Sequence, residues 1–584
     1  MTEPEVFVHT VSEACRLVPS SSRWNSIELD FNLLPPSSNY DCASPHFSKS
    51  YHFNLTITDK KTFKRFLYAS ASLVIVIVAI VLLVKLLPHK HHHHGHSRNF
   101  TIPVRQALSF FDAQKSGNFP KNSEVKFRGD SGLQDGNTTG TNYVNLIGGY
   151  YDSGNNIKFT FPTAHTITLL SWSVIEYHHK YSNIGELDHV MDIIKWGTDY
   201  LLKVGSASNS TTTDNDINCW QRPEDMSYPR PVSVCRDTAS DLAGELVAAL
   251  SAASIVFKVQ TAYSLQLMKA AEELFGLVTR ENLKQGVYTL DNACGGEAGQ
   301  FYNSSGYLDE LVWGATWLYF ATGNNSHLQY ATDTFQLALT AEQDVDKGVY
   351  DWNNKLLANA VLLTRLMYFH DPGNPYEGAL ETSADMTNSF VCSFISQQNF
   401  TRTPGGLILL RPSAPLQYTV TTSFLSKLYN DYLYAMRSPG VYCGNMDISL
   451  DILQNFSMSQ ARNNPKKMSY LVGFGEDSFP SQVHHRAASI RWDNQQHSCE
   501  EGKKWLNSKD PNPNVLMGAM VAGPDQDDNF IDSRDRPEYT EPTISGNAGL
   551  VAALIALHVP VHSSSRLKNI DGTGLDQIGI FDNI

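Results

Sequence analysis

The segment His165–Lys180, HTITLLSWSVIEYHHK, repeats apolar side chains at the spacing of an α-helix. Sustained alternation of the kind that marks a β-strand is scarce, and long polar loops such as 127–149 and 490–514 separate the helical segments. We therefore predict one large all-α domain, a toroid of pairwise packed helices whose loops build a cleft at one end. Asp237 or Ser240 is the predicted cap of the helix that begins near Asp241. The further helical segments are Leu187–Leu202, Asp241–Val259, Ser264–Val278, Leu308–Ala321, Leu356–Phe369, Thr421–Met436 and Asn547–Leu557.

Composition excludes several classes of protein. The chain has 584 residues, of which 42% are hydrophobic and 18% charged, so it has the content of a buried core rather than of a disordered chain. Its formal net charge is −14, and no basic stripe offsets that charge, which disfavours a nucleic-acid partner. Aromatic residues reach 11%, which is compatible with sugar stacking but more typical of core packing.

An uncharged run of apolar residues extends from Phe66 to Val84, FLYASASLVIVIVAIVLLV. A run of about 20 such residues is typical of a membrane-crossing helix, and this one begins too far into the chain for a cleaved signal peptide. Lysines and an arginine crowd its N-terminal end, which predicts a cytosolic tail at 1–65 and a signal anchor at 66–87. The His-rich stretch 88–98 is predicted to be a solvated stalk, with metal binding as the alternative.

Glycosylation sites and cysteines agree with that orientation. Acceptor sequences follow the anchor at Asn99, Asn137, Asn209, Asn303, Asn324, Asn399 and Asn455, and only Asn54 precedes it. The six cysteines beyond the anchor lack the C-x-x-C spacing of a metal site, which predicts one or two disulfides or buried thiols. Cys219 with Cys235 is the predicted bridge.

Three loop segments gather titratable and small residues. The first is Gly148–Phe159, GGYYDSGNNIKF, the second Ser469–Arg486, and the third Phe530–Ala548. Each alone is a weak signal, because acidic loops are usually solvated. Together and in this order they resemble glycoside hydrolase family 9, the inverting β-1,4-glucanases. The second segment resembles the histidine signature of that family, and the third its acidic signature.

The resemblance extends over roughly residues 99 to 560 and includes Phe127–Gly136, Cys219–Met226 and Asp309–Trp317. With the N-terminal anchor, the likeness is to the plant membrane-anchored (KORRIGAN-type) subgroup. It implies an (α/α)6 barrel with an open cleft, here a domain at 99–563 followed by a tail at 564–584. It also implies action on cellulose or related β-1,4-glucans and no cofactor, with a structural calcium left open.

The same resemblance implies roles for individual residues. Glu541 is the general acid. The family's first loop reads D-A-G-D, in which the last Asp is the general base and the first helps to hold the attacking water. Here Asp152 is retained and Asn155 occupies the base position. His484 and Arg486 would bind sugar hydroxyls, and Asp532 would support Glu541 or bind the sugar. The candidate sugar platforms, for each of which core packing is the alternative, are Trp220, Trp313, Trp317 and Trp352.

Two functional hypotheses remain open at this point. In the first, the chain is a membrane-anchored endo-β-1,4-glucanase of the plasma membrane or the Golgi, and Asp152 replaces the missing base. In the second, it is a pseudoenzyme that binds glucan or organises a cell-wall synthesis complex, because an amide cannot accept a proton near neutral pH. Deamidation of Asn155 before Asn156, which would regenerate Asp, is a minor third reading.

Overall fold

The computed structural model describes residues 99–559 except for gaps at 137–143, 205–215, 236–238, 342–347, 397–399, 463, 467 and 476–477. Before residue 99 it describes only Lys61, Lys64, Arg65, Tyr68 and Ser72. The chain divides into two units, Met1–His93 and His94–Ile584, and the second carries the features below.

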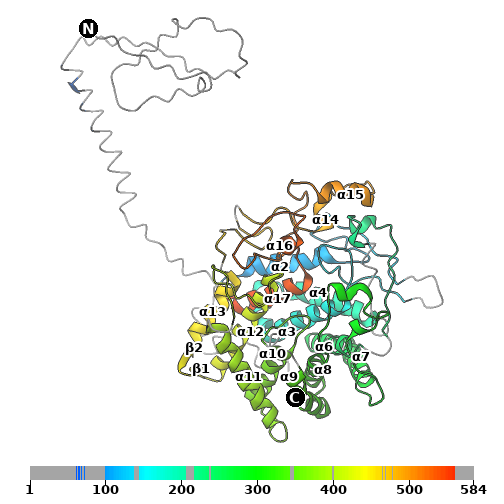
Figure 1. Ribbon diagram of the computed structural model, residues 1–584, viewed down its shortest axis with the longest axis vertical. Coiled ribbons are helices and arrows are strands. Elements are labelled where there is room, and N and C mark those ends of the chain that lie inside the picture. The colour runs from blue at the N-terminus through cyan, green and yellow to red at the C-terminus, as the bar shows by residue number, and fades with distance from the viewer. Residues whose placement is uncertain are drawn as a thin grey trace, which may run out of the picture. The chain divides into compact units, whose positions relative to one another are not determined.

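Within the described residues of the second unit, a closed ring of six inner helices forms the centre of the fold (Figure 1). Each contacts the next in the order α3, α6, α8, α10, α12, α17, and α17 closes the ring against α3. Each inner helix also packs against one outer helix, so the architecture is the predicted (α/α)6 barrel. The inner helices are α3 (Thr160–Ile184), α6 (Ser240–Val256), α8 (Leu308–Thr322), α10 (Leu356–Phe369), α12 (Pro415–Ala435) and α17 (Ile544–Leu557).

The outer helices face solvent on one side and an inner helix on the other. In α9, for example, a single stripe is buried against α8, whereas α8 is buried on nearly every face. The outer helices are α4 (Leu187–Val204), α7 (Thr261–Val278), α9 (Asn325–Ala341), α11 (Glu377–Ile395), α13 (Leu450–Arg462) and α2 (Thr101–Gln114).

Large aromatic rings fill the interior of the ring. Trp172 of α3 lies 5.7 Å from Trp313 and 6.0 Å from Trp317 of α8, measured between ring centroids, and all three side chains are fully buried. Such bulky side chains explain why the inner helices read as apolar on all sides.

The loop end of the barrel carries the short helices α14 (Arg486–Ser489), α15 (Cys499–Leu506) and α16 (Pro537–Thr540), which Figure 1 shows near α2. Three 3-10 turns, η3 (Pro223–Asp225), η4 (Tyr288–Leu290) and η5 (Gly296–Gln300), also lie in loops. A hairpin of β1 (Gly440–Cys443) and β2 (Met446–Ser449) is antiparallel and contacts α11.

The eight helical segments predicted from periodicity all form helices. The ends agree for Leu356–Phe369 and differ by up to six residues in the others. The helices that periodicity missed, α2, α9, α11 and α13, are outer helices whose buried stripes are interrupted by small or polar residues. Ser240 does not cap α6, because its hydroxyl accepts a hydrogen bond from the Gly286 amide instead, and Asp237 lies outside the described residues.

The predicted disulfide between Cys219 and Cys235 is wrong. Cys219 pairs with Cys499, Cys235 pairs with Cys294, and a third bridge joins Cys392 to Cys443. Cys219 and Cys499 are 280 residues apart in the chain, so only the closed barrel brings them together. Proximity in sequence was therefore a poor guide to pairing.

In the part of the chain that the structure describes, no helix has the length and apolar character needed to cross a membrane. The predicted anchor at 66–87 lies outside the described residues apart from Tyr68 and Ser72. The tail at 1–65 lies outside them apart from Lys61, Lys64 and Arg65, as do the whole stalk at 88–98 and the tail at 564–584. Asn99, Asn303, Asn324 and Asn455 are exposed, and Asn137, Asn209 and Asn399 are not described.

Candidate active site

The loop Gly148–Phe159 is held in place by main-chain hydrogen bonds to distant elements. The Tyr151 amide donates to Gln114 at the end of α2, and the carbonyl of Asp152 accepts from the Ile544 amide at 2.9 Å. Gly154 is required here, since a Cβ at this position would lie 2.0 Å from the carbonyl oxygen of His484. The close approach at Gly154 brings the first and second sequence segments into direct contact.

Asp152 is 2% exposed. The Tyr302 hydroxyl donates to its Oδ2 at 2.6 Å, while Oδ1 has no hydrogen-bond partner among the described residues. Burial raises the pKa of Asp152 to about 7; the Tyr302 hydrogen bond opposes that shift and the nearby charge of Glu541 adds to it. A carboxyl group with this pKa is ionised above neutral pH and can then accept a proton.

Glu541 lies between two helices that fix its main chain. It directly follows α16, and Thr543, two residues later, caps α17 by accepting a hydrogen bond from the Gly546 amide. Its Oε1 accepts hydrogen bonds from the Ser153 hydroxyl at 2.8 Å and from the Gly154 amide at 3.1 Å. The first and third sequence segments therefore meet at this carboxyl group, which remains partly exposed.

Asn155 occupies the position that the family resemblance assigns to the general base. Its side-chain nitrogen donates to the Ser153 hydroxyl at 2.6 Å, and its oxygen accepts from the Ile157 amide at 2.9 Å. Both ends of the amide are thus bonded within its own loop. Because an amide has no basic lone pair to accept a proton near neutral pH, Asn155 provides no general base.

His484 is partly exposed, and its orientation is fixed on one side by the main chain. Its Nδ1 lies 2.6 Å from the carbonyl oxygen of Arg534, which accepts from that nitrogen, so Nε2 is the ring atom left for other partners. The ring packs edge-on against Trp220, with centroids 4.8 Å apart.

Arg486 and Trp220 are both buried, and the structure corrects their prediction as sugar-contacting residues. The Arg486 guanidinium forms an ion pair with Asp216 and lies 5.4 Å from the Trp220 ring. The indole nitrogen of Trp220 donates to the Ser489 hydroxyl. Burial leaves these two side chains no surface for a sugar. They instead pack behind the loop that carries His484.

Trp313 and Trp317 are also corrected as sugar platforms, because both lie in the fully buried aromatic centre of the barrel. Trp352 is only partly buried, and its ring lies 4.8 Å from that of Tyr302, the partner of Asp152. Of the four predicted tryptophans, Trp352 is the one whose placement fits a platform beside loop 148–159.

Asp532 lies at the base of the histidine segment. Its carboxylate accepts hydrogen bonds of 2.8 to 2.9 Å from the amide and hydroxyl of Ser481 and from the amide of Gln482. Asp532 therefore holds the turn that leads into His484, and its support of Glu541 is indirect.

Sequence reasoning missed three residues of this site. Tyr302 bonds Asp152, Ser153 bonds Glu541, and Gln114 joins the carbonyls of Tyr151 and Ser153 to the His485 ring. Ser153 carried a signal, since the family's D-A-G-D has alanine there. Tyr302 and Gln114 carried none, because each reaches its partner only in the folded chain.

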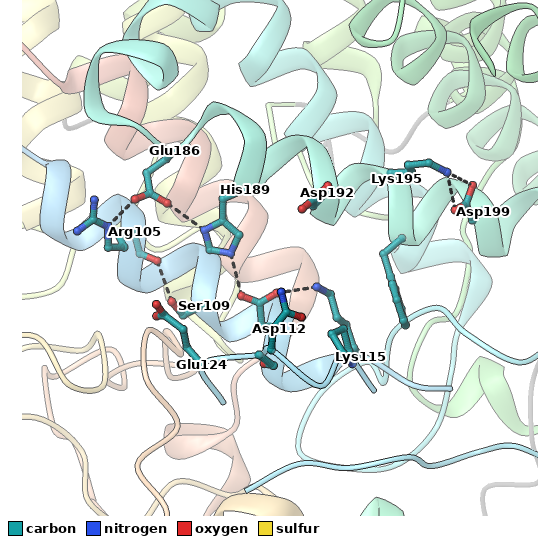
Figure 2. Close-up of a pocket in the computed structure, with 14 residues that line it drawn as sticks. Arg105, Ser109, Asp112, Lys115, Glu124, Glu186, His189, Asp192, Lys195 and Asp199 are labelled. Carbon is teal, nitrogen blue, oxygen red and sulfur yellow. Dashed lines mark hydrogen bonds and ion pairs between the residues drawn. The ribbon is translucent and has the colours of Figure 1, made fainter. Parts of the chain in front are cut away.

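A polar cavity of about 480 Å³ lies against α2 and α4 (Figure 2). His189 lies in it between Asp112 at 2.8 Å and Glu186 at 2.9 Å, and Glu186 also pairs with Arg105. Hydrogen bonds and the charges of the two carboxylates outweigh desolvation and raise the pKa of His189 to about 9. This cavity shares none of the predicted site residues.

No group of three or more His, Cys, Asp or Glu side chains among the described residues is arranged to hold a metal ion.

Comparison with known proteins identifies the family of this chain. Residues 100–554 match glycosyl hydrolase family 9. Endoglucanase 25 of Arabidopsis thaliana is 47% identical over 486 residues, covering 79% of this chain and 77% of that protein, and Endoglucanase 10 of Oryza sativa subsp. japonica is 46% identical, covering 78% and 77%. The endoglucanase structure from the termite Nasutitermes takasagoensis has a TM-score of 0.67 and 32% identity, covering 78% of this chain and 98% of that chain. The chain is a glycoside hydrolase and belongs to glycosyl hydrolase family 9.

Proposed function

We propose that this protein is an endo-β-1,4-glucanase that hydrolyses cellulose or a related glucan with inversion. Relatives named as endoglucanases support the reaction class, and the cellulase Cel9M of C. cellulolyticum, 27% identical, has been solved with cellobiose. The observation that carries the proposal is the contact between Glu541 and the Asp152 loop, made by Ser153 and Gly154. It brings an acid and a retained carboxylate into one site.

Inverting hydrolysis requires one carboxylic acid and one carboxylate acting from opposite sides of the scissile bond. Glu541 serves as the acid that protonates the leaving oxygen. Asp152 serves as the base, with its unpaired Oδ1 as the acceptor for a proton of the attacking water. Because Asp152 is only 2% exposed, the attacking water has to enter beside the loop to reach this oxygen.

The test is hydrolysis of carboxymethylcellulose by the folded region after the anchor, with Glu541→Gln and Asp152→Asn as variants. Removal of a placed acid or base costs roughly 10²–10⁴-fold in rate, so each variant should lose at least about a hundredfold. Wild-type rate in Asp152→Asn would remove Asp152 from the mechanism. The anomeric configuration of the first product, read by NMR, checks inversion.

A second candidate function is glucan binding without turnover, and Asn155 is the observation that favours it. The amide replaces the family's base and is bonded at both ends, while Asp152 lies buried below it. In that case the wild type would bind cellooligosaccharides without cutting them, and only Asn155→Asp would hydrolyse. Comparable rates for the wild type and Asn155→Asp exclude this candidate.

We also propose that segment 66–87 anchors the protein in a membrane, with 1–65 cytosolic and the hydrolase domain on the opposite side. The apolar run and the acceptor sequences after it support this topology. The plasma membrane is the proposed location, with Golgi membranes next, and cell-wall synthesis complexes are the proposed protein partners. Resistance of the full chain to carbonate extraction, together with a mobility shift on deglycosylation that Asn303→Gln and Asn455→Gln reduce, tests the topology.

A further inference from the structure

The hydroxyl group of Ser153 lies between Asn155 and Glu541. Ser153 is a buried residue that is 3% exposed. The orientation of the Asn155 amide is set by the Ile157 main-chain N–H, which can only donate and therefore faces the amide oxygen at 2.9 Å. The amide nitrogen consequently faces Ser153 at 2.6 Å. Since that nitrogen can only donate, Ser153 Oγ accepts from Asn155.

A serine hydroxyl has a single proton to donate. Because its oxygen accepts from Asn155, that proton is left for a carboxyl group: Oε1 of Glu541 lies 2.8 Å away, whereas no hydrogen bond joins Ser153 to Oδ1 of Asp152, whose pKa Ser153 also lowers. The Gly154 amide donates to the same oxygen at 3.1 Å. Because both donors face Oε1, Oε2 is the oxygen left to carry the acidic proton when Glu541 acts as the acid.

We propose that Ser153 is a positioning residue for the general acid Glu541, and that Asn155 directs the Ser153 hydroxyl proton to it. The inference deepens the proposed hydrolase function and rests on it. Ser153 and Asn155 then act as a matched pair. A carboxylate at position 155 accepts hydrogen bonds only, so it would take the Ser153 proton away from Glu541.

The first test uses aryl cellotriosides whose leaving groups differ in their need for protonation. Phenolate is a poor leaving group and needs the acid, whereas 2,4-dinitrophenolate leaves without it. With loss of one hydrogen bond to the acid, Ser153→Ala should lower kcat on the phenyl substrate by roughly tenfold. On the dinitrophenyl substrate the loss should stay below about twofold, with KM unchanged on both.

Equal losses on both substrates would overturn the proposal, since a general defect of the loop does not discriminate between leaving groups. Ser171→Ala is the matched control. Ser171 is a fully buried serine of α3 whose hydroxyl has no hydrogen-bond partner in the described part of the chain, and its removal should alter neither rate.

The second test reverses the effect of the same substitution. In an Asn155→Asp background, Ser153 bonds Asp and no longer serves Glu541, so Ser153→Ala should raise hydrolysis of carboxymethylcellulose several-fold by freeing the new carboxylate. In the wild-type background the substitution should lower it. The same direction of change in both backgrounds overturns the coupling between the two residues.

This design separates the inference from the function on which it rests. If the wild type hydrolyses nothing, the proposed turnover by Asp152 fails. The comparison of Asn155→Asp with Ser153→Ala/Asn155→Asp still tests the hydrogen bond made by Ser153, because both proteins carry a carboxylate at position 155. A rate of the double variant at or below that of Asn155→Asp then overturns the inference.

Discussion

The Tyr302 hydroxyl donates a 2.6 Å hydrogen bond to Oδ2 of Asp152, across 150 residues of sequence. That bond lowers the pKa of Asp152 against the larger effect of burial, and the result is a pKa of about 7. Burial and Tyr302 together therefore set the pH range in which Asp152, the only acidic side chain of loop 148–159, is ionised.

Tyr302→Phe should raise the pKa of Asp152 further, by about one unit, because the ionised form loses a hydrogen-bond donor. If Asp152 is the base, the acidic limb of the kcat/KM profile moves to higher pH. Activity at pH 6 then falls roughly tenfold, and activity at pH 9 approaches that of the wild type. A pH series of initial rates on carboxymethylcellulose measures the shift.

Tyr350→Phe is the control for this substitution. Tyr350 is buried in the same barrel, and its hydroxyl has no hydrogen-bond partner among the described residues. An unmoved acidic limb in Tyr302→Phe, as in the control, would show that Asp152 does not govern the reaction.

The ion pairs of His189 in the polar cavity of Figure 2 predict a pH-dependent stability. The pKa of His189 is raised to about 9, so its charged form stabilises the fold fully below the unfolded-state pKa of about 6.5. That stabilisation is lost as the pH rises from 6.5 through 9. His189→Gln should lower the free energy of unfolding by about 2 kcal/mol at pH 6, a value reduced for the exposed part of the side chain.

The difference between His189→Gln and wild type should shrink steadily towards pH 9.5 in urea unfolding. His327 is the control, because burial lowers its pKa and its replacement should show no loss that fades with rising pH. A difference for His189→Gln that is constant with pH would mean that the imidazole is not charged.

The Cys219–Cys499 disulfide ties the Trp220 loop to the start of α15. Because the closed loop spans 280 residues, replacing both cysteines by serine should cost about 2–5 kcal/mol of stability. Trp220 packs on His484, so kcat/KM should also fall several-fold. Thermal unfolding and initial rates measure the two effects.

The Cys392–Cys443 disulfide provides a matched control, since it joins α11 to β1 and closes a shorter loop, with a sequence separation of 51. Its removal should lower the unfolding temperature while leaving kcat/KM unchanged. Equal kinetic losses for both pairs would contradict a specific role for the Cys219 bridge.

Lys355 is fully buried with two carboxylates, 3.1 Å from Glu245 and 3.7 Å from Glu310. Its ammonium group also donates to the Trp352 carbonyl at 2.6 Å. Lys355→Met leaves the carboxylates without their cation and should destabilise the protein by about 3–5 kcal/mol at pH 8.

At pH 6 the loss in Lys355→Met should be smaller, because burial raises the pKa of Glu245 to about 7 and that of Glu310 well above its usual range, and protonation removes their charge. Adding Glu245→Gln to Lys355→Met should recover part of the stability at pH 8. A loss that is equal at both pH values, with no recovery, would argue that packing and not charge is responsible.

Much of the fold can be predicted from contiguous stretches of the sequence. Helix α10, Leu356–Phe369, was predicted with its exact ends, since an inner helix is apolar on almost every face. The outer helix α9 was missed, because its stripe of Leu328, Ala331, Phe335 and Ala338 is diluted by polar residues. The resemblance of the three loop segments to the family implied the barrel, which the structure confirms, and the role of Glu541 as the acid, which stays a prediction.

What the sequence by itself determined is thus the helical architecture and the resemblance to the family, with Asn155 at the position that this resemblance assigns to the base. These follow from periodicity and from motifs that are each contiguous in the chain. Only the tertiary structure decided that Trp313 is core, that Cys219 pairs with Cys499, and that Ser153 bonds Glu541 across 388 residues. The physical reason is that closure of the ring of inner helices sets those contacts, and no local pattern encodes which distant side chains it brings together.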